Sequence, residues 1–105
     1  MIRFLLWLAL TIAAPVAASA QMQETQTGRT IALTVCSDCH QVEPRPRTPS
    51  PHESAPRFAD VAQMPSTTET SLKVFLRSTH ATMPNFQFTN EELNSVVAYI
   101  LAMKQ

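Results

Sequence analysis

The chain has 105 residues, with eight basic and eight acidic side chains and therefore a formal net charge of zero at neutral pH. A chain of this length builds one small domain, and its balanced charge offers neither a basic surface for nucleic acid nor an acidic tail. A domain this small often needs an additional constraint, such as a disulfide or a bound cofactor, because it buries little apolar surface. A disulfide between Cys36 and Cys39, the two cysteines present, would close too small a loop to stabilise much.

Residues 1–20 have the pattern of a secretory signal peptide. Arg3 gives a positive start, residues 4–14 form an apolar run too short to span a bilayer, and residues 18–20 (Ala-Ser-Ala) form a small-residue cleavage site. We therefore expect a mature domain of residues 21–105 in the periplasm, with no membrane span after cleavage. The alternative is an uncleaved membrane anchor, which the short apolar run disfavours.

The first predicted helix of the mature domain runs directly into Cys36. Small or apolar side chains recur along it at the spacing of one buried helix face: Gly28, Ile31, Ala32 and Val35. The next segment, residues 41–51, contains four prolines, which cannot continue a helix. This composition predicts a stiff loop after the helix.

Three more helices are predicted after this loop. Pro56 suits the first turn of a short helix. Ser66 with Glu69 has the form of a capping box for the next helix, and Thr89 with Glu92 has the same form for the last one. No segment alternates apolar and polar residues over the length of a strand. The predicted fold class is therefore all-α, with four or so helices.

Residues 36–40, Cys-Ser-Asp-Cys-His, carry the chemistry. Cys36 and Cys39 are spaced to meet the two vinyl groups of haem, and His40 is placed to bind the iron from below the ring. Covalent attachment would keep the cofactor from being lost outside the cytoplasm, and the haem would supply the core that the chain lacks. The motif predicts one c-type haem held by Cys36, Cys39 and His40.

Three other interpretations of this motif compete with haem attachment. A thioredoxin-like redox pair follows a strand in a βαβ unit, whereas a helix precedes Cys36. A zinc site needs a fourth ligand, for which only His52 and His80 remain. Buried cysteines beside a chance histidine are the third interpretation, which an exported chain without any other cysteine disfavours. The haem interpretation is favoured over all three.

The sixth position on the iron decides between electron transfer and ligand binding. Met83 lies in an irregular segment, residues 80–88, and Pro84 after it pins the local chain direction. A methionine in a loop can bring its sulfur to the iron opposite His40, whereas the other methionines of the mature domain lie in or beside helices or near a chain end. Met83 is the predicted sixth ligand, and His80 is the alternative.

Taken together, residues 36–40, 80–86 and 96–100 resemble the matching segments of a small class I cytochrome c. The resemblance covers nearly all of the mature domain. It implies a cytochrome c-like fold wrapped around one covalent haem, with His40 and Met83 as the two axial ligands.

The resemblance also implies two structural contacts. The first and last helices of the family cross closely, with a glycine on the first against an aromatic residue on the last, and these are Gly28 and Tyr99 here. A loop proline of the family accepts, through its carbonyl, a hydrogen bond from the proximal histidine, which fixes the ring. We expect Pro51, ahead of Pro49, to be that residue, by its distance along the chain.

With both axial positions filled, the iron has no open place for a substrate, so one-electron transport is expected and enzymatic catalysis is not. Redox partners are expected to dock weakly over an exposed haem edge. Arg45 and Arg47 either pair with haem propionates or rim the docking face, or they are solvated side chains of the loop. Two alternatives remain open. One is a haem subunit of a periplasmic dehydrogenase, and the other is a redox or gas sensor in which a small ligand displaces Met83.

Overall fold

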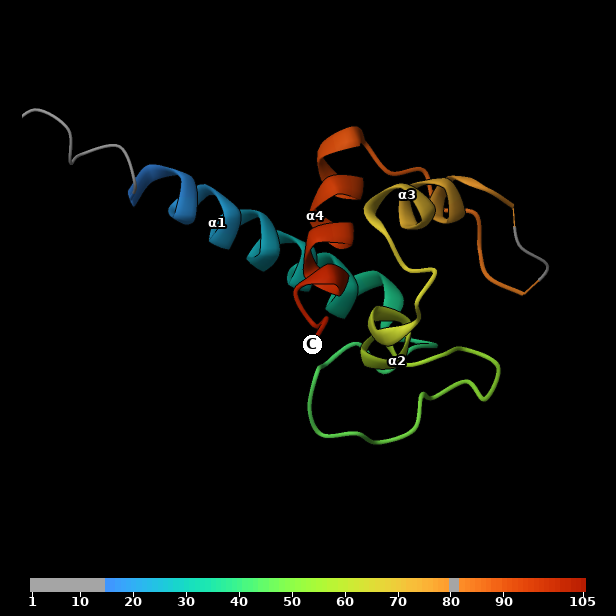
Figure 1. Cartoon of the computed structure of the whole chain (residues 1–105). Coiled ribbons are helices and arrows are strands. Elements are labelled where there is room, and N and C mark those ends of the chain that lie inside the picture. Colours follow the sequence, from blue (N-terminus) through green and yellow to red (C-terminus); the bar gives the residue numbers. More distant parts are fainter. Residues whose placement is uncertain (1–14, 80–81) are drawn as a thin grey trace, which may run out of the picture.

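The computed structural model describes residues 15–79 and 82–105, and within these ranges the chain is helical and contains no strand. The elements are α1 (Pro15–Ile31), the π-helical turn η1 (Ala32–Cys36), α2 (Phe58–Gln63), α3 (Glu69–Arg77) and α4 (Asn90–Leu101). Figure 1 shows α1 crossing α4, while α2 and α3 lie on opposite sides of the chain that continues from α1. The predicted all-α class is confirmed.

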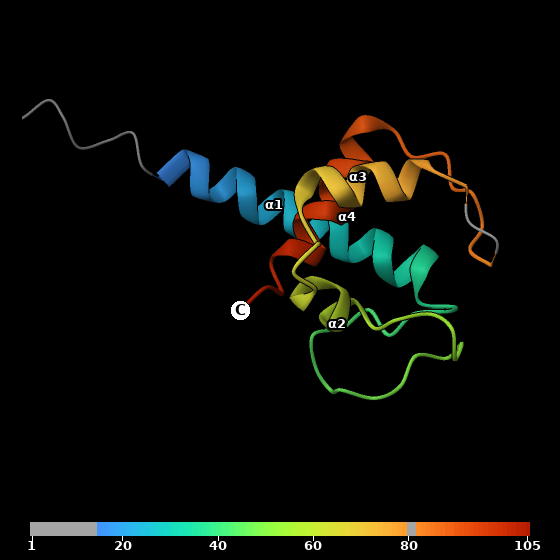
Figure 2. The same ribbon diagram turned by 45° about the vertical axis from the view of Figure 1, so that its right-hand side comes forward.

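The N-terminal half of α1 extends away from the other helices (Figures 1 and 2). The predicted cleavage site after Ala20 lies inside α1, whereas residues 1–14 lie outside the described residues. Among the helices described, none is both long and apolar enough to cross a membrane. Removal of residues 1–20 stays a prediction.

Local hydrogen bonds determine where α3 and α4 begin. The predicted capping box at the start of α4 is present, because Thr89 and Glu92 exchange side-chain and backbone bonds. The predicted box at the start of α3 is wrong. There Thr68 and Ser71 exchange these bonds, and Glu69 pairs instead with Lys73 one helical turn later.

The crossing of α1 and α4 is a contact between two backbones. A Cβ atom added to Gly28 would lie 1.9 Å from the carbonyl oxygen of Ser95 and 2.8 Å from Cβ of Tyr99. Only glycine allows so close an approach, since any other residue would place its side chain inside α4. The predicted contact between Gly28 and Tyr99 is confirmed.

The core lies around this crossing and reaches into the chain after the motif. Its buried side chains come from η1, the following loop, α2, α3 and α4: Ala32, Cys36, Val42, Phe58, Ala62, Leu72, Leu93, Val96, Val97, Tyr99 and Ile100. The hydroxyl of Tyr99 donates a buried hydrogen bond to the carbonyl of Val42 at 2.8 Å. This bond ties α4 to the loop, so the crossing also positions the chain that leaves the motif.

Replacing Gly28 with alanine is expected to destabilise the haem-loaded protein by about 1–3 kcal/mol, because the added methyl forces α1 and α4 apart. The intrinsic helix preference of alanine, worth about 1 kcal/mol, acts in the opposite direction and does not offset a clash with backbone atoms. Thermal unfolding followed by circular dichroism measures the effect.

The matched control is Thr27→Ala, on the neighbouring exposed position of the same helix. Its hydroxyl donates to the carbonyl of Gln23 within α1, so its loss is expected to change the midpoint temperature little. Equal stability of Gly28→Ala and Thr27→Ala would contradict the close approach of the two helices.

Candidate functional site

The predicted motif lies where the first helix ends. Cys36 is the last residue of η1, and the backbone N–H groups of Cys39 and His40 both donate to its carbonyl, at 3.2 and 2.9 Å. The hydrogen bond from the N–H of Ser37 to the carbonyl of Ala32, 3.0 Å long, closes the π-helical turn. Such turns occur frequently at functional sites. The turn thus delivers both thiols and the histidine within one short bend.

The two thiols differ in burial. Both are free, and Cys36 is only 6 % exposed whereas Cys39 is half-buried. Burial raises the pKa of the Cys36 thiol from 9.0 to about 11, because a thiolate would lose its solvation inside the core. Cys36 is therefore held as a neutral thiol at physiological pH.

The ring of His40 is held from two sides. Its Nδ1 lies 2.6 Å from the carbonyl oxygen of Pro56, and its ring centroid lies 5.3 Å from that of buried Phe58. A carbonyl oxygen only accepts, so Nδ1 carries the proton and donates it. In the neutral ring Nε2 then keeps its lone pair, which is the tautomer that a metal-binding histidine requires.

The carbonyl that holds His40 belongs to Pro56, and the prediction of Pro51 is wrong. Two backbone bonds bring the chain back to the motif only after the proline-rich loop: the N–H of His52 donates to Cys39 at 3.0 Å, and that of Phe58 donates to Gln41 at 2.9 Å. Pro51 is exposed before this return is complete. Distance along the chain could not show where the loop closes.

Pro56 also lies outside α2, which begins at Phe58 with Arg57 as its N-cap. The expectation that Pro56 occupies the first helical turn is therefore wrong, and the correction explains its role. The signal that could have identified it is its place two residues before Phe58, a large apolar residue that anchors the chain in the core.

Met83 lies half-buried in a bend between α3 and α4, and exposed Pro84 follows it. Figures 1 and 2 both show this segment and the end of η1 on the same side of the molecule, away from the free end of α1. His80, the alternative ligand, lies outside the described residues. The side of the molecule that carries the motif is thus also the side that carries Met83.

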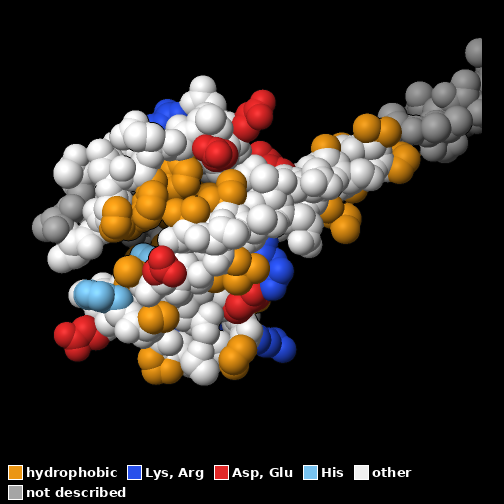
Figure 3. Space-filling model, turned by 180° about the vertical axis from the view of Figure 1, so that it is seen from behind, with side chains coloured by type: hydrophobic (Ala, Val, Ile, Leu, Met, Phe, Trp, Pro, Cys, Tyr) orange, Lys and Arg blue, Asp and Glu red, His pale blue; other side chains and the backbone are white. Residues whose placement is uncertain are grey.

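Apolar side chains remain partly exposed near these segments. Leu33 of η1 is 39 % exposed and Phe75 of α3 is 49 % exposed. Figure 3 shows hydrophobic side chains gathered along a hollow in one face of the molecule, with a histidine side chain inside it. Two thiols, an imidazole lone pair and an apolar surround are the donor set and the environment of a covalent haem. The residues present therefore fit this cofactor.

Within residues 15–79 and 82–105, no three or more His, Cys, Asp or Glu side chains are grouped so that they could hold a metal ion.

The helical fold of the described residues, with a thiol pair and a held histidine at a helix end, has the features of a covalent haem protein. A model of the family described as Cytochrome c matches residues 25–104, which is most of the chain. The chain belongs to the cytochrome c family. Searches of curated proteins and of solved structures gave no match.

Membership of this family gives the chain a general function. It is a haem electron carrier with covalently bound haem c, and it exchanges electrons with redox partners. Domains of this family are usually extracellular or periplasmic.

The burial of Cys36 predicts a slow thiol wherever the haem-free chain keeps its helices, which circular dichroism of the same sample establishes. At pH 8, iodoacetamide is expected to modify Cys36 about tenfold more slowly in the folded chain than in denaturant, because a higher pKa leaves less thiolate and higher nucleophilicity offsets only part of this loss. The folded-state rate is expected to keep rising with pH until about pH 11.

Peptide mapping by mass spectrometry measures both cysteines in one sample, so Cys39 reports the reagent and the exposure time. A Cys36 that reacts equally fast in the folded and denatured chains would contradict its burial.

Proposed function

We propose that the chain is a periplasmic one-electron carrier with a single haem, attached through Cys36 and Cys39 and ligated by His40 and Met83. The observation that carries this proposal is the held ring of His40, whose Nδ1 lies 2.6 Å from the carbonyl of Pro56 directly beyond two thiols. A histidine that serves only as a surface or core residue has no need of this tautomer. The arrangement suits an axial ligand.

The haem supplies a reversible one-electron change at its iron. The protein contributes a ligand that stays in place. The Pro56 carbonyl fixes His40 along its Nδ1–H bond, and Phe58 limits rotation of the ring from its side. A ligand that moves little costs little reorganisation when the charge changes, which favours a carrier.

Met83 is the proposed second ligand because of its place in the chain. It follows α3 in a bend, it is half-buried, and its segment lies on the side of the molecule that carries the end of η1. A thioether is uncharged and flexible, so it adapts to the position that a loop offers. Methionine in this place also raises the reduction potential.

The periplasmic location rests on the signal-peptide pattern of residues 1–20 and on the thioether chemistry of the motif. Partner docking is proposed at the exposed haem edge. The half-exposed apolar side chains of Leu33 and Phe75 support this placement, since small electron-transfer interfaces are brief and need only limited apolar contact. Positive and negative side chains are equal in number over the chain, so charge is expected to guide the encounter with a partner only near the docking face.

Met83→Ala tests the ligand set. The ferric wild-type protein, produced with haem-attachment machinery, is expected to show an iron–sulfur charge-transfer band in its absorption spectrum, and Met83→Ala is expected to abolish it. Met64→Ala is the matched control, because Met64 is 47 % exposed beyond the end of α2 and is expected to leave the band intact. A wild-type spectrum without the band, or a band that persists in Met83→Ala, would contradict Met83 as the second ligand.

Covalent attachment is tested by the double variant Cys36→Ala, Cys39→Ala. The wild-type protein is expected to retain its haem through denaturation in acidic organic solvent, whereas the double variant is expected to lose it completely. The mass of the denatured chain measures attachment directly. Haem that stays bound to the denatured double variant would disprove thioether links at these two residues.

A further inference from the structure

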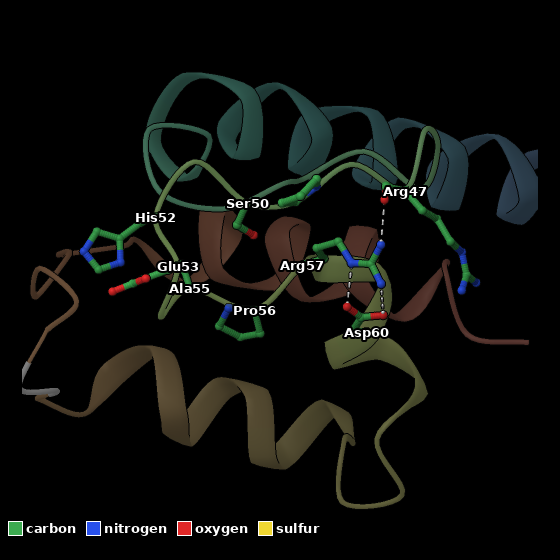
Figure 4. A pocket seen from close by; sticks show the side chains of 9 residues that line it. Arg47, Ser50, His52, Glu53, Ala55, Pro56, Arg57 and Asp60 are labelled. Carbon is green, nitrogen blue, oxygen red and sulfur yellow. Dashed lines mark hydrogen bonds and ion pairs between the residues drawn. The ribbon is translucent and has the colours of Figure 1, made fainter.

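Arg57 lies between the two residues that hold His40. Its Nε and one terminal nitrogen donate to the two carboxylate oxygens of Asp60, at 2.6 and 3.0 Å. Its other terminal nitrogen donates to the backbone carbonyl of Arg47 at 2.9 Å. Figure 4 shows these bonds joining the proline-rich loop to α2 beside Pro56. One guanidinium group therefore connects three parts of the chain next to the ligand.

This ion pair is too exposed to add much stability. The side chains of Arg57 and Asp60 are 26 % and 47 % exposed, and pairs in such positions contribute little to the free energy of unfolding. The pKa of Asp60 is lowered, first because its carboxylate accepts hydrogen bonds from Arg57 and further through the charges of Arg57 and Arg47. A bidentate contact between a guanidinium and a carboxylate fixes the orientation of both groups, because both groups are planar and rigid.

The direction of the Pro56 carbonyl depends on Arg57 through the peptide bond. The carbonyl of Pro56 and the nitrogen of Arg57 belong to one planar unit, so fixing the backbone of Arg57 fixes where that oxygen points. Arg57 is fixed twice: its guanidinium binds Asp60, and its own carbonyl accepts the N–H of Asp60 at 3.0 Å. These contacts therefore fix the direction of the Pro56 carbonyl oxygen, which accepts the Nδ1–H bond of His40.

Solvent is close enough to compete for this oxygen. An open pocket of about 470 Å³ borders Pro56, Arg57 and Asp60 (Figure 4). If the loop loosened, water from this pocket could solvate the Pro56 carbonyl in place of His40. The contacts of Arg57 with Asp60 and with the Arg47 carbonyl therefore keep solvent from replacing His40 at the Pro56 carbonyl.

We propose that Arg57 is a positioning residue for His40, whose clamp on Asp60 and on the Arg47 carbonyl holds the Pro56 carbonyl against Nδ1. This proposal rests on the proposed ligation of the iron by His40. A strong bond at Nδ1 makes the imidazole a better electron donor and stabilises the oxidised iron. Loss of the clamp weakens that bond and raises the midpoint potential.

Two variants of the haem-loaded full chain test this. Arg57→Gln removes both the positive charge and the bidentate contact with Asp60, whereas Arg57→Lys keeps the charge and loses the bidentate contact. Both are expected to raise the midpoint potential, measured by redox titration. Both are also expected to speed solvent exchange of the His40 Nδ1–H about tenfold, the size of effect expected for loss of an ordinary hydrogen bond, measured by NMR of the reduced protein.

The sign of the potential shift distinguishes positioning from simple charge. Removing a positive charge favours the oxidised protein and lowers the potential, so an effect of charge alone would lower it in Arg57→Gln. Arg77→Gln, which removes an exposed arginine at the end of α3 that donates to the side chain of Asn90, is the matched control and is expected to leave the exchange rate unchanged. A fall in potential in Arg57→Gln equal to that in Arg77→Gln, with unchanged exchange, would overturn the proposal.

Asp60→Asn covers the case in which the Arg57 variants fold poorly. It keeps Arg57 and the bond to the Arg47 carbonyl, and it is expected to shift exchange and potential in the same direction by a smaller amount; unchanged exchange would count against the clamp. Failure of the proposed function would give a different result. If His40 did not bind the haem iron, the NMR spectrum of the wild-type protein would lack His40 signals shifted by the haem ring.

Discussion

The contact on which the rest of the structure depends is the approach of Gly28 to the backbone of α4. It allows the backbones of α1 and α4 to approach each other closely where the two helices cross. Because α1 continues without a break into η1, the position of this crossing also determines where Cys36 ends the helix. Tyr99, at the same crossing, reaches over to the carbonyl of Val42 and fixes the chain just beyond His40. The motif is thus held on both sides by one pair of helices.

From the crossing outward, the site is completed by a long loop that returns to its starting point. The backbone bond between Phe58 and Gln41 closes this loop, and the closure places the Pro56 carbonyl at Nδ1 of His40. A buried aromatic ring, Phe58, anchors the return in the core. The apolar core that forms the fold therefore also selects which carbonyl meets the histidine.

The sequence predicted what depends on local pattern and missed what depends on long-range closure. Periodicity predicted the helices, and the spacing of Thr89 and Glu92 predicted the cap of α4, because both are interactions within a few residues. At α3 the pattern pointed to Ser66 and Glu69, whereas hydrogen bonds between Thr68 and Ser71 determine where the helix begins. Pro56 could not be chosen over Pro51, since no local pattern records where a proline-rich loop comes back.

Two kinds of contact divide the work in this chain. The crossing at Gly28 is buried and made between backbones, so it governs whether the helices assemble. The contact of Arg57 with Asp60 is exposed and adds little to stability, but it lies one peptide bond from the atom that holds His40. In the proposed arrangement, stability and the properties of His40 as a ligand depend on different residues. A surface ion pair of this kind can change with little effect on folding, which leaves the reduction potential adjustable within an unchanged fold.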